Sequence, residues 1–310
     1  MPERTLVTGA LGCLGAWTLK ALVELGEEPV GFDLGSDDAR LRLVLTDEER
    51  AKVTLVSGDV TDAAVVGRTL DEHEITNVVH LAALQVPFCR ADPERGARVN
   101  VHGTVVVFEA TKKRLGRIRG VAYASSTAVY NASDPSPAPE SGGTAPSTLY
   151  GVFKLANEGT ARVYWSDDDV ASIGIRPYVV YGPGRDQGLT SGSSLAMEAA
   201  ARGEGHTIAY GGTAQYDFAP DVGRAFALAA RAATDGAHVT NFPGVPSTMQ
   251  EVVDAIEAAA PIVAGRVFWE EGQLPFPEAL EGRQLERLIG PIAPTSLTDG
   301  VRATIEHFRG

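Results

Sequence analysis

The chain has 310 residues, 44% of them hydrophobic and 22% charged, which is the composition of a globular protein with a large core rather than of a disordered or fibrous one. Its net charge of −13 opposes binding to nucleic acid or to anionic membranes, because their phosphates would be repelled. The first residues show no secretion signal, and no apolar run approaches the roughly 18 residues that a membrane span needs. We therefore expect a cytoplasmic protein.

Short apolar runs alternate with helical stretches along the first 180 residues. Residues 78–81, VVHL, are mainly apolar without alternation, which is typical of a strand that is buried on both faces. The pattern predicts an α/β fold of the Rossmann type, with a doubly wound parallel sheet covered by helices on both sides. Strands are expected at residues 5–8, 29–33, 53–57, 77–81, 119–125 and 171–176, and helices at 18–25, 63–71, 94–113 and 150–164.

The pattern becomes looser after residue 176. Glycine-rich stretches around 182–192 and 203–212 precede helices that we expect near 222–233, 249–260 and 298–308. The segment 131–147 is rich in proline, serine and glycine, and we interpret it as a mobile loop beside the functional site rather than as a linker between domains.

Three other features argue against alternative classes of site. The basic cluster at residues 112–119 is interpreted as a helix end, because cations suit the C-terminus of a helix. The acidic run at 167–169 is likewise interpreted as a solvated helix end. Cys13 and Cys89 have neither a disulfide pattern nor metal-site spacing. We expect no nucleic-acid partner and no metal ion.

A glycine pattern follows the first predicted strand. Residues 8–15 read TGALGCLG, which spaces three glycines as G-x-x-G-x-x-G between a strand and a helix. Glycine permits a sharp turn and a close approach of the backbone to a pyrophosphate, while the helix start offers N–H groups to the phosphates. A tight turn alone would also favour glycine. We expect dinucleotide contacts from Gly9, Leu11, Gly12, Cys13, Leu14 and Gly15.

Asp33 ends the next predicted strand, within about 20 residues of the last glycine, where a carboxylate can accept hydrogen bonds from the adenosine ribose. The alternative is a solvated aspartate at the end of a strand. Because the negative charge of Asp33 would repel a ribose 2′-phosphate and no arginine follows immediately, NAD is favoured over NADP.

Tyr150 and Lys154 are four residues apart on a predicted helix, so both side chains lie on one face. A phenol normally titrates near about 10, and a nearby ammonium would lower its pKa so that it can exchange a proton with an alcohol. Lys154 can also bind the nicotinamide ribose. The spacing is common by chance, and a surface pair is the alternative.

Hydroxyl side chains follow the strand predicted at residues 119–125. Ligands of parallel sheets bind beyond the carboxyl ends of the strands, so these hydroxyls face the cofactor crevice. We assign Ser126 to the reacting oxygen, although Ser125 or Thr127 could exchange roles with it.

Together these motifs resemble those of the extended short-chain dehydrogenases/reductases, and most closely the NAD-dependent epimerase/dehydratase family, over about the first 185 residues. Their order along the chain carries the resemblance: the glycines, Asp33, DV at 59–60, HLAA at 80–83, Asn100, SSTAVY at 125–130, Tyr150 with Lys154, and RPYVVYGPG at 176–184.

The resemblance implies further contacts with NAD. Asp59 and Val60 would flank the adenine, Asn100 would order a helix near the site, and Pro177 and Val180 would lie against the nicotinamide. The remaining expected cofactor residues are Leu81, Ala82, Ala83, Ala124, Ser125, Tyr150 and Lys154.

The chain departs from the family pattern at two places. Dehydratases carry an acidic pair after the catalytic hydroxyl residue, where this chain has Ala128 and Val129, so dehydration is disfavoured. Nucleotide-sugar epimerases often carry an R-D-[FY] segment whose arginine pairs with the diphosphate. The matching stretch here, QYDFAPDV at 215–222, lacks that arginine and is shorter.

Because a diphosphate usually draws arginines, we expect a sugar, sugar acid or related polyol without a nucleotide. Arg90 and Arg185 are candidate partners for a carboxylate or phosphate. The expected substrate contacts are Gln85, Ser126, Thr127, Tyr150 and Arg185.

These observations predict an NAD-dependent oxidoreductase that acts as a net dehydrogenase on a secondary alcohol. If the ketone rotates and is reduced on its other face, the same residues make an epimerase with tightly bound NAD, similar to UDP-glucose 4-epimerase. A non-catalytic NAD-sensing protein is the third alternative, which the Ser/Tyr/Lys set disfavours.

We expect residues 1–176 to form the NAD-binding domain, with 216–240 returning to it, and residues 177–215 and 241–310 to form the substrate-binding portion. The resemblance also implies a homodimer whose interface includes the helices at 94–113 and 150–164.

Overall fold

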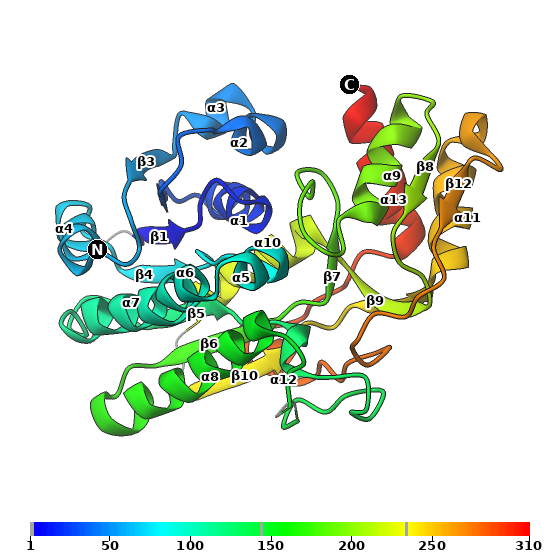
Figure 1. Ribbon diagram of the computed structural model, residues 1–310. Coiled ribbons are helices and arrows are strands. Elements are labelled where there is room, and N and C mark those ends of the chain that lie inside the picture. The colour runs from blue at the N-terminus through cyan, green and yellow to red at the C-terminus, as the bar shows by residue number, and fades with distance from the viewer. Residues whose placement is uncertain (1–2, 143–144, 233–234) are drawn as a thin grey trace.

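A seven-stranded sheet runs through the larger part of the molecule in the computed structural model, which describes residues 3–142, 145–232 and 235–310 (Figure 1). The strand order is β10-β6-β5-β4-β1-β2-β3, and all neighbouring pairs are parallel. The doubly wound α/β prediction is therefore confirmed. The strands are β1 (Thr5–Thr8), β2 (Val30–Asp33), β3 (Thr54–Ser57), β4 (Asn77–His80), β5 (Val121–Ala124), β6 (Ser172–Arg176) and β10 (Ala237–Asn241).

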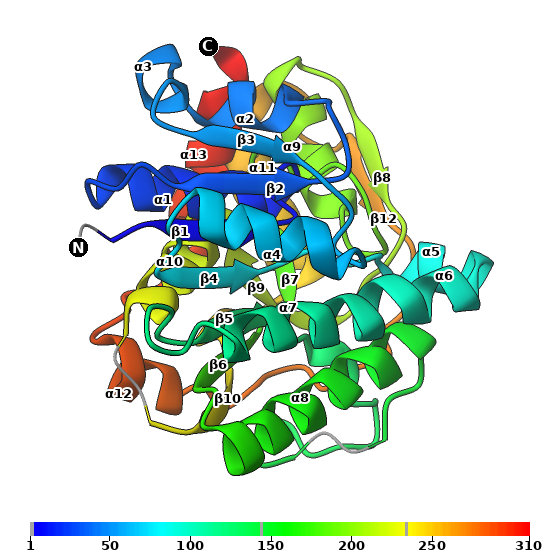
Figure 2. The same ribbon diagram turned by 90° about the vertical axis from the view of Figure 1, so that its left-hand side faces the viewer.

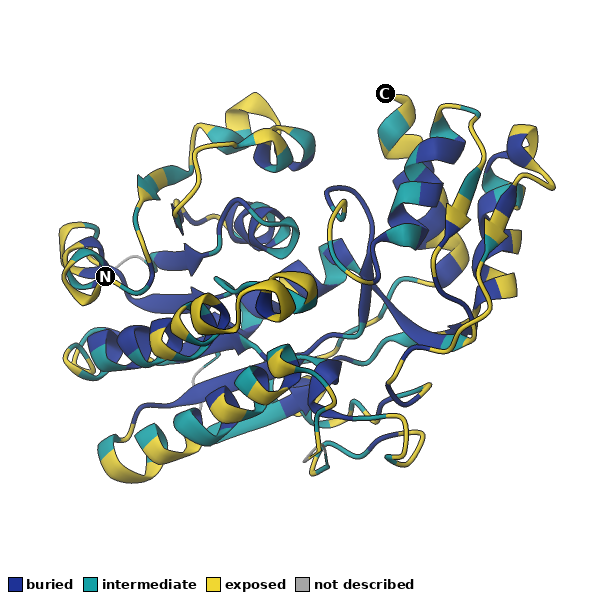
Figure 3. Cartoon of the chain, in the orientation of Figure 1, coloured by how far each residue is buried: buried dark blue, intermediate teal, exposed yellow. Residues whose placement is uncertain are grey.

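Helices cover both faces of this sheet, and its inner strands are buried, whereas the edge strand β3 is partly exposed (Figures 2 and 3). One layer pairs α1 with α10, whose buried side chains form a core with the sheet. The other layer contains α4, α7 and α8, which pack over a separate apolar cluster. Their bounds are α1 (Cys13–Glu24), α10 (Ala219–Arg231), α4 (Ala63–Glu72), α7 (Gly103–Lys112) and α8 (Leu149–Asp168).

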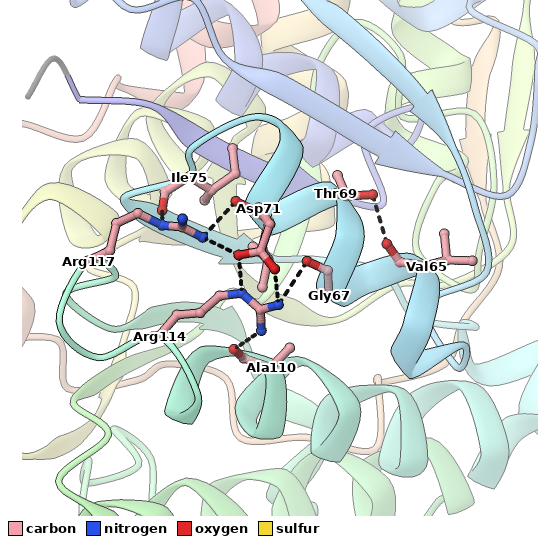
Figure 4. Close-up of polar contacts among 9 residues, drawn as sticks. Val65, Gly67, Thr69, Asp71, Ile75, Ala110, Arg114 and Arg117 are labelled. Carbon is pink, nitrogen blue, oxygen red and sulfur yellow. Dashed lines mark hydrogen bonds and ion pairs between the residues drawn. The ribbon is translucent and has the colours of Figure 1, made fainter.

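Ion pairs fasten the second helix layer and involve four of the five basic side chains at residues 112–119. Arg114 and Arg117 both bond Asp71 at the end of α4, with the closest contacts at 2.5 and 2.8 Å (Figure 4). Lys112 pairs with Asp168, and Arg119 with Glu3, each at 2.8 Å. These basic side chains are matched by carboxylates within the protein, so they do not form a free cationic surface.

A smaller part, at the right of Figure 1, has its own apolar core. It contains a three-stranded sheet of order β11-β9-β7 and a two-stranded sheet of β12 and β8, against which three helices pack. The elements are β7 (Val179–Tyr181), α9 (Gly192–Ala201), β8 (His206–Ile208), β9 (Thr213–Phe218), β11 (Val245–Thr248), α11 (Met249–Ala259), β12 (Val267–Trp269) and α13 (Leu297–Arg309).

Short helical elements complete the described chain. They lie in the connections between the longer elements. The sequence patterns did not predict them, except where two of them fall in the helix expected over 94–113. They are α2 (Ala39–Val44), α3 (Asp47–Arg50), α5 (Val86–Ala91), α6 (Pro93–Ala97), a π-helical turn (Arg98–His102), 3₁₀ turns at Thr127–Val129 and Pro261–Val263, and α12 (Gln284–Ile289).

Two expected elements differ in detail. Helix α1 begins at Cys13 and not at residue 18, because the helix starts directly on the glycine turn. The helix expected over 94–113 is divided into α6, the π-helical turn and α7.

The segment 131–147 was expected to be a mobile loop beside the site. Its Ala138 forms backbone hydrogen bonds with Ala279 and Glu281, each 2.9 Å long, which fasten the loop to the C-terminal part of the chain. Residues 143–144 of this segment lie outside the described residues.

The return of the chain to the large sheet occurs after β9. Helix α10 packs on α1, and β10 pairs with β6 along its outer edge. Across the described ranges, we find no helix long and apolar enough to cross a membrane.

Candidate active site

A cavity of about 800 Å³ opens at the carboxyl ends of the central strands, between the two parts of the molecule. All expected cofactor and substrate residues except Asn100 line it. From the first part these are Gly9, Leu11, Gly12, Cys13, Leu14, Gly15, Asp33, Asp59, Val60, Leu81, Ala82, Ala83, Gln85, Ala124, Ser125, Ser126, Thr127, Tyr150 and Lys154, and from the second Pro177, Val180 and Arg185.

The glycine turn leaves room for bare backbone only. Gly9 has φ +71°, and a Cβ added there would lie 2.7 Å from the backbone nitrogen of Ala82. A Cβ on Gly15 would lie 2.2 Å from the carbonyl oxygen of Gly9. The N-cap of α1 is Gly12, which has no side chain to occupy the first N–H groups of the helix. This cradle therefore fits the pyrophosphate of a dinucleotide.

Asp33 is held in place at the edge of the cavity. Its Oδ2 accepts a hydrogen bond from the Leu11 N–H and its Oδ1 accepts one from the Gly35 N–H, both 3.0 Å long. Each carboxylate oxygen has a second lone pair, so the side chain can still accept from ribose hydroxyls.

Further along the same wall, Asp59 is fixed by hydrogen bonds of 2.8 Å from the backbone N–H and the hydroxyl of Thr61. The backbone bond, followed by the smaller effect of the hydroxyl, lowers the pKa of the Asp59 carboxyl against the opposing effect of burial. Asp59 is therefore an ordered anion beside Val60 in the cavity wall.

Asn100 lies behind the cavity wall, on the π-helical turn, and is 1% exposed. Its Oδ1 accepts from the Leu84 N–H at 2.7 Å, and its Nδ2 donates to the Leu84 carbonyl oxygen at 2.8 Å. The direct cofactor contact expected for Asn100 is thus replaced by a positioning role, because the amide is fully used in ordering the segment after β4.

The candidate catalytic pair lies on α8. Lys154 is 4% exposed and donates a 2.6 Å hydrogen bond to the carbonyl oxygen of Ala124 at the end of β5. Burial lowers the pKa of Lys154 from its ordinary 10.5 to about 8. Burial also raises the pKa of Tyr150, against the opposing effects of the Ser126 hydroxyl and of Arg185.

The expected lowering of the phenol pKa by Lys154 is therefore not seen in the structure. The physical reason is that the ammonium bonds Ala124 while desolvation dominates the environment of the Tyr150 oxygen. Both side chains nevertheless share the cavity wall, as the i, i+4 spacing predicted.

The three hydroxyls after β5 have different surroundings. Ser125 donates to a carboxylate oxygen of Glu158, and Thr127 donates to the Pro177 carbonyl oxygen at 3.0 Å. The Ser126 oxygen accepts from the Ala128 N–H at 3.1 Å, which leaves its proton free to donate. This arrangement supports Ser126 as the group that faces the phenol and a substrate oxygen.

A model of the NAD dependent epimerase/dehydratase family matches residues 5–242 of the chain. The chain belongs to this family. It is therefore an NAD-dependent enzyme of the extended short-chain dehydrogenase/reductase class, and the residues around the glycine turn fit that cofactor.

Among the proteins that the chain resembles are several nucleotide-sugar epimerases. The UDP-glucose 4-epimerase of Mycolicibacterium smegmatis is 31% identical over 314 residues, covering 99% of this chain and 98% of that protein. UDP-glucuronate 4-epimerase 3 of Arabidopsis thaliana is 32% identical over 57% of this chain and 42% of its own length. The solved UDP-glucose 4-epimerase of Thermus thermophilus, in complex with NAD, has a TM-score of 0.82 and 26% identity over 99% of both chains.

One buried ion pair in this family member was not predicted. Arg176, at the end of β6, donates two hydrogen bonds of 2.7 Å to the carboxylate of Glu158 on α8, where the side chains are 4% and 6% exposed. Arg176 also bonds the Tyr130 hydroxyl, and Ser125 bonds the same carboxylate. The network ties α8, which carries the candidate catalytic pair, to the sheet. The feature of the sequence that could have indicated this ion pair is Glu158, which lies four residues after Lys154 and therefore on the same face of the helix.

The substrate side of the cavity contains polar atoms that stay unsatisfied among the described residues. Gln85 Oε1, Tyr178 Oη and Arg185 Nε are buried and form no hydrogen bond there. A Cβ on Gly188 would meet Gln85 Oε1 at 2.1 Å and Arg185 Nη2 at 3.1 Å, so these two side chains converge. By contrast, Arg90 is exposed on α5 and does not line the cavity.

Several cavity residues were missed because they come from segments without a motif. Arg40 lies on α2, whereas Leu189 and Thr190 follow the glycine-rich turn after β7. Phe276 comes from the C-terminal portion and packs edge-on against Tyr178, with ring centroids 6.0 Å apart. No group of three or more His, Cys, Asp or Glu side chains suited to a metal ion occurs within the described ranges.

Proposed function

We propose that the protein is an NAD-dependent epimerase that inverts a secondary alcohol of a sugar carried by a nucleotide. The observation that carries this proposal is the end-to-end similarity to the M. smegmatis UDP-glucose 4-epimerase. It favours the epimerase alternative over the net dehydrogenase that the sequence motifs had put first. The Ser126, Tyr150 and Lys154 arrangement supports either reaction.

Tyr150 is the proposed acid/base. Its phenolate form takes the proton of the substrate hydroxyl, and the phenol returns a proton to the oxygen in the reverse half-reaction. Ser126 donates a hydrogen bond to the reacting oxygen. Lys154, which donates to the Ala124 carbonyl oxygen, fixes the ribose next to the reacting carbon. NAD, when bound, supplies the hydride acceptor and the returning hydride.

An epimerase needs room for the oxidised sugar to turn before reduction. The composition of the cavity wall suits this requirement, because the polar side chains of Gln85 and Arg185 line it together with the apolar side chains of Leu189 and Phe276. A carbonyl sugar held mainly through its nucleotide can rotate between such walls.

Arg185 is the proposed partner of the substrate diphosphate or of a sugar carboxylate. Its guanidinium lies close enough to Tyr150 to favour the phenolate. A planar guanidinium binds phosphate or carboxylate oxygens through two N–H groups.

The deciding experiment incubates the NAD-loaded protein with UDP-glucose, UDP-galactose or UDP-glucuronate and analyses the sugars by NMR. We expect interconversion of one pair of C4 epimers with no net NADH, and no conversion by Tyr150→Phe. Lack of any epimer would contradict the proposal.

A second candidate is a net dehydrogenase of a sugar acid without a nucleotide. One observation favours it: Tyr216, which precedes Asp217 and Phe218 where an R-D-[FY] segment has its arginine, is 2% exposed and packs against Tyr181, with ring centroids 6.3 Å apart. It is not available to a diphosphate. Stoichiometric NADH from a sugar acid, without epimers, would support this candidate, and neither product from any sugar would favour the NAD-sensing alternative.

We also propose a cytoplasmic homodimer. Support for the interface is the row of apolar side chains on α8, where Leu149, Val152 and Val163 are 44%, 45% and 56% exposed. Support for a reducing compartment is that Cys13 and Cys89 are both free thiols.

A further inference from the structure

An ion pair joins the cofactor side of the cavity to the loop that carries the substrate-side arginine. Arg40, on α2, donates from Nε and Nη2 to Asp186 Oδ1 at 3.2 and 2.7 Å. Asp186 directly follows Arg185, in the connection between β7 and α9. The pair thus spans two segments that are 146 residues apart in the chain.

The same guanidinium also holds the glycine turn. Arg40 Nη1 donates to the Leu11 carbonyl oxygen at 3.1 Å, while the N–H of Leu11 is bound by Asp33 at 3.0 Å. One residue of the cofactor cradle is therefore held from both sides. Movement of Asp186 would be transmitted through Arg40 to this cradle.

A second tether joins the same connection to α1. Trp17 Nε1, on α1, donates to the Pro183 carbonyl oxygen at 2.9 Å, and the Cys13 thiol lies 3.8 Å from that oxygen. The connection after β7 is thus held at Pro183 and at Asp186, on either side of Arg185. Between and beyond these tethers, Gly184 and Gly188 both have positive φ, a conformation that favours glycine.

We propose that Arg40 and Asp186 are positioning residues that couple NAD binding to substrate binding. With the pair formed, the connection holds Arg185 beside Gln85 and covers the cofactor cradle. Breaking the pair lets the connection and the cofactor cradle move, so substrate binds more weakly and NAD leaves faster. Because such coupling is reciprocal, each ligand then loses the same factor in affinity that it had gained from the other.

Folding stability alone would not produce this result. The two side chains are 25% and 46% exposed, and ion pairs at such exposure contribute little to stability. Their removal should therefore leave the fold intact while the two ligand-binding steps change.

The test compares Asp186→Asn with the native protein in two measurements. In the first, protein loaded with NADH is mixed with excess NAD, and the fall in NADH fluorescence gives the release rate. In the second, KM and kcat are measured for UDP-galactose. We expect release to be about 5-fold faster or more, and KM to rise by a similar factor, with a much smaller change in kcat.

Two further variants separate coupling from a general structural effect. Arg42→Gln removes another exposed arginine of α2, whose partner is Asp38, and should change neither measurement. The double variant Arg40→Asp with Asp186→Arg exchanges the two charges. It should recover a large part of the slow NADH release that either single variant loses.

Unchanged NADH release in Asp186→Asn, or equal effects in Arg42→Gln, would overturn the proposal. The KM measurement rests on the proposed function, whereas the release measurement needs only NAD. If the native protein does not convert UDP-galactose, the proposed substrate is wrong, and the release rates alone decide whether the ion pair retains the cofactor.

Discussion

The ammonium nitrogen of Lys154 lies 5.5 Å from the centre of the Tyr150 ring, one turn away on α8. It donates at the same time to the carbonyl oxygen at the end of β5. A single lysine thus touches the strand that ends in the hydroxyl residues and the helix that carries the phenol. Proton transfer at Tyr150 is therefore sensitive to the position of both elements.

Tyr150→Phe removes only the phenolic oxygen, which is the atom proposed to exchange the proton. The variant should therefore reduce turnover by roughly 10²–10⁴-fold, at about the upper end. The ring packing stays, so thermal unfolding and NAD affinity should be nearly unchanged. Turnover of the epimer pair and a parallel NAD titration check this. Substantial remaining activity would mean that another group carries the proton.

Lys154→Met should abolish most activity and also weaken NAD binding. Its effect on stability should depend on pH, because burial lowers the pKa of Lys154 from 10.5 to about 8. The folded protein bears the cost of the buried ammonium fully below about pH 8, and this cost disappears as pH rises towards 10.5. The native protein should therefore become more stable relative to the variant over that range, by about 2–3 kcal/mol. Denaturant unfolding at about pH 7 and about pH 10 measures the difference, and a gap that does not change with pH would contradict it.

Ser126→Ala should lower turnover more strongly than the sequence suggested. The neighbouring hydroxyls of Ser125 and Thr127 had been expected to offer partial cover, yet both donate elsewhere in the structure. We expect a loss of about 10-fold or more, since one hydrogen bond to the reacting oxygen is removed. Ser125→Ala is the matched control and should mainly lower stability. Equal kinetics in the two variants would argue against the assignment of Ser126.

Asp33→Ala should weaken NAD binding by roughly 1.5–3 kcal/mol and improve NADP relative to NAD. The variant removes both an acceptor for the ribose and the charge that repels a 2′-phosphate. Asp33→Asn removes the charge but keeps one acceptor oxygen. Its preference for NAD over NADP should therefore lie between that of the native protein and that of Asp33→Ala. Titration with both cofactors checks the order, and an unchanged preference would place the discrimination elsewhere.

Val152→Glu with Val163→Glu should separate a homodimer into monomers. The two positions are about three turns apart and share a face of α8, and a charge buried in an interface is costly. Sedimentation at micromolar concentration gives the mass of both proteins. A monomeric native protein would refute the predicted dimer.

Local patterns were sufficient for the features that local chemistry determines. The glycine turn, Asp33 and the Tyr150 and Lys154 spacing each depend on a few consecutive residues, and each lies in the cavity wall. A strand followed by a turn and a helix places these groups at the same edge of a parallel sheet. That geometry follows from the order of elements alone.

Features that depend on contacts between distant parts of the chain could not be predicted from local sequence patterns. Arg40 and Phe276 enter the cavity only because segments far apart in the chain pack there. The pKa of Tyr150 depends on burial that no spacing reveals. The direct role expected for Asn100 differs from its placement because the π-helical turn directs the amide to the backbone of Leu84.

The position of β10 has a consequence for shortened forms of the enzyme. This strand covers the outer edge of β6, although β7, α9, β8 and β9 of the smaller part lie between them in the sequence. A fragment ending near residue 185 would contain every motif that is expected to contact the cofactor and yet present the uncovered backbone of β6 to other molecules. Such a fragment should self-associate. A minimal cofactor-binding form would instead require a short bridge from β6 directly to α10 and β10.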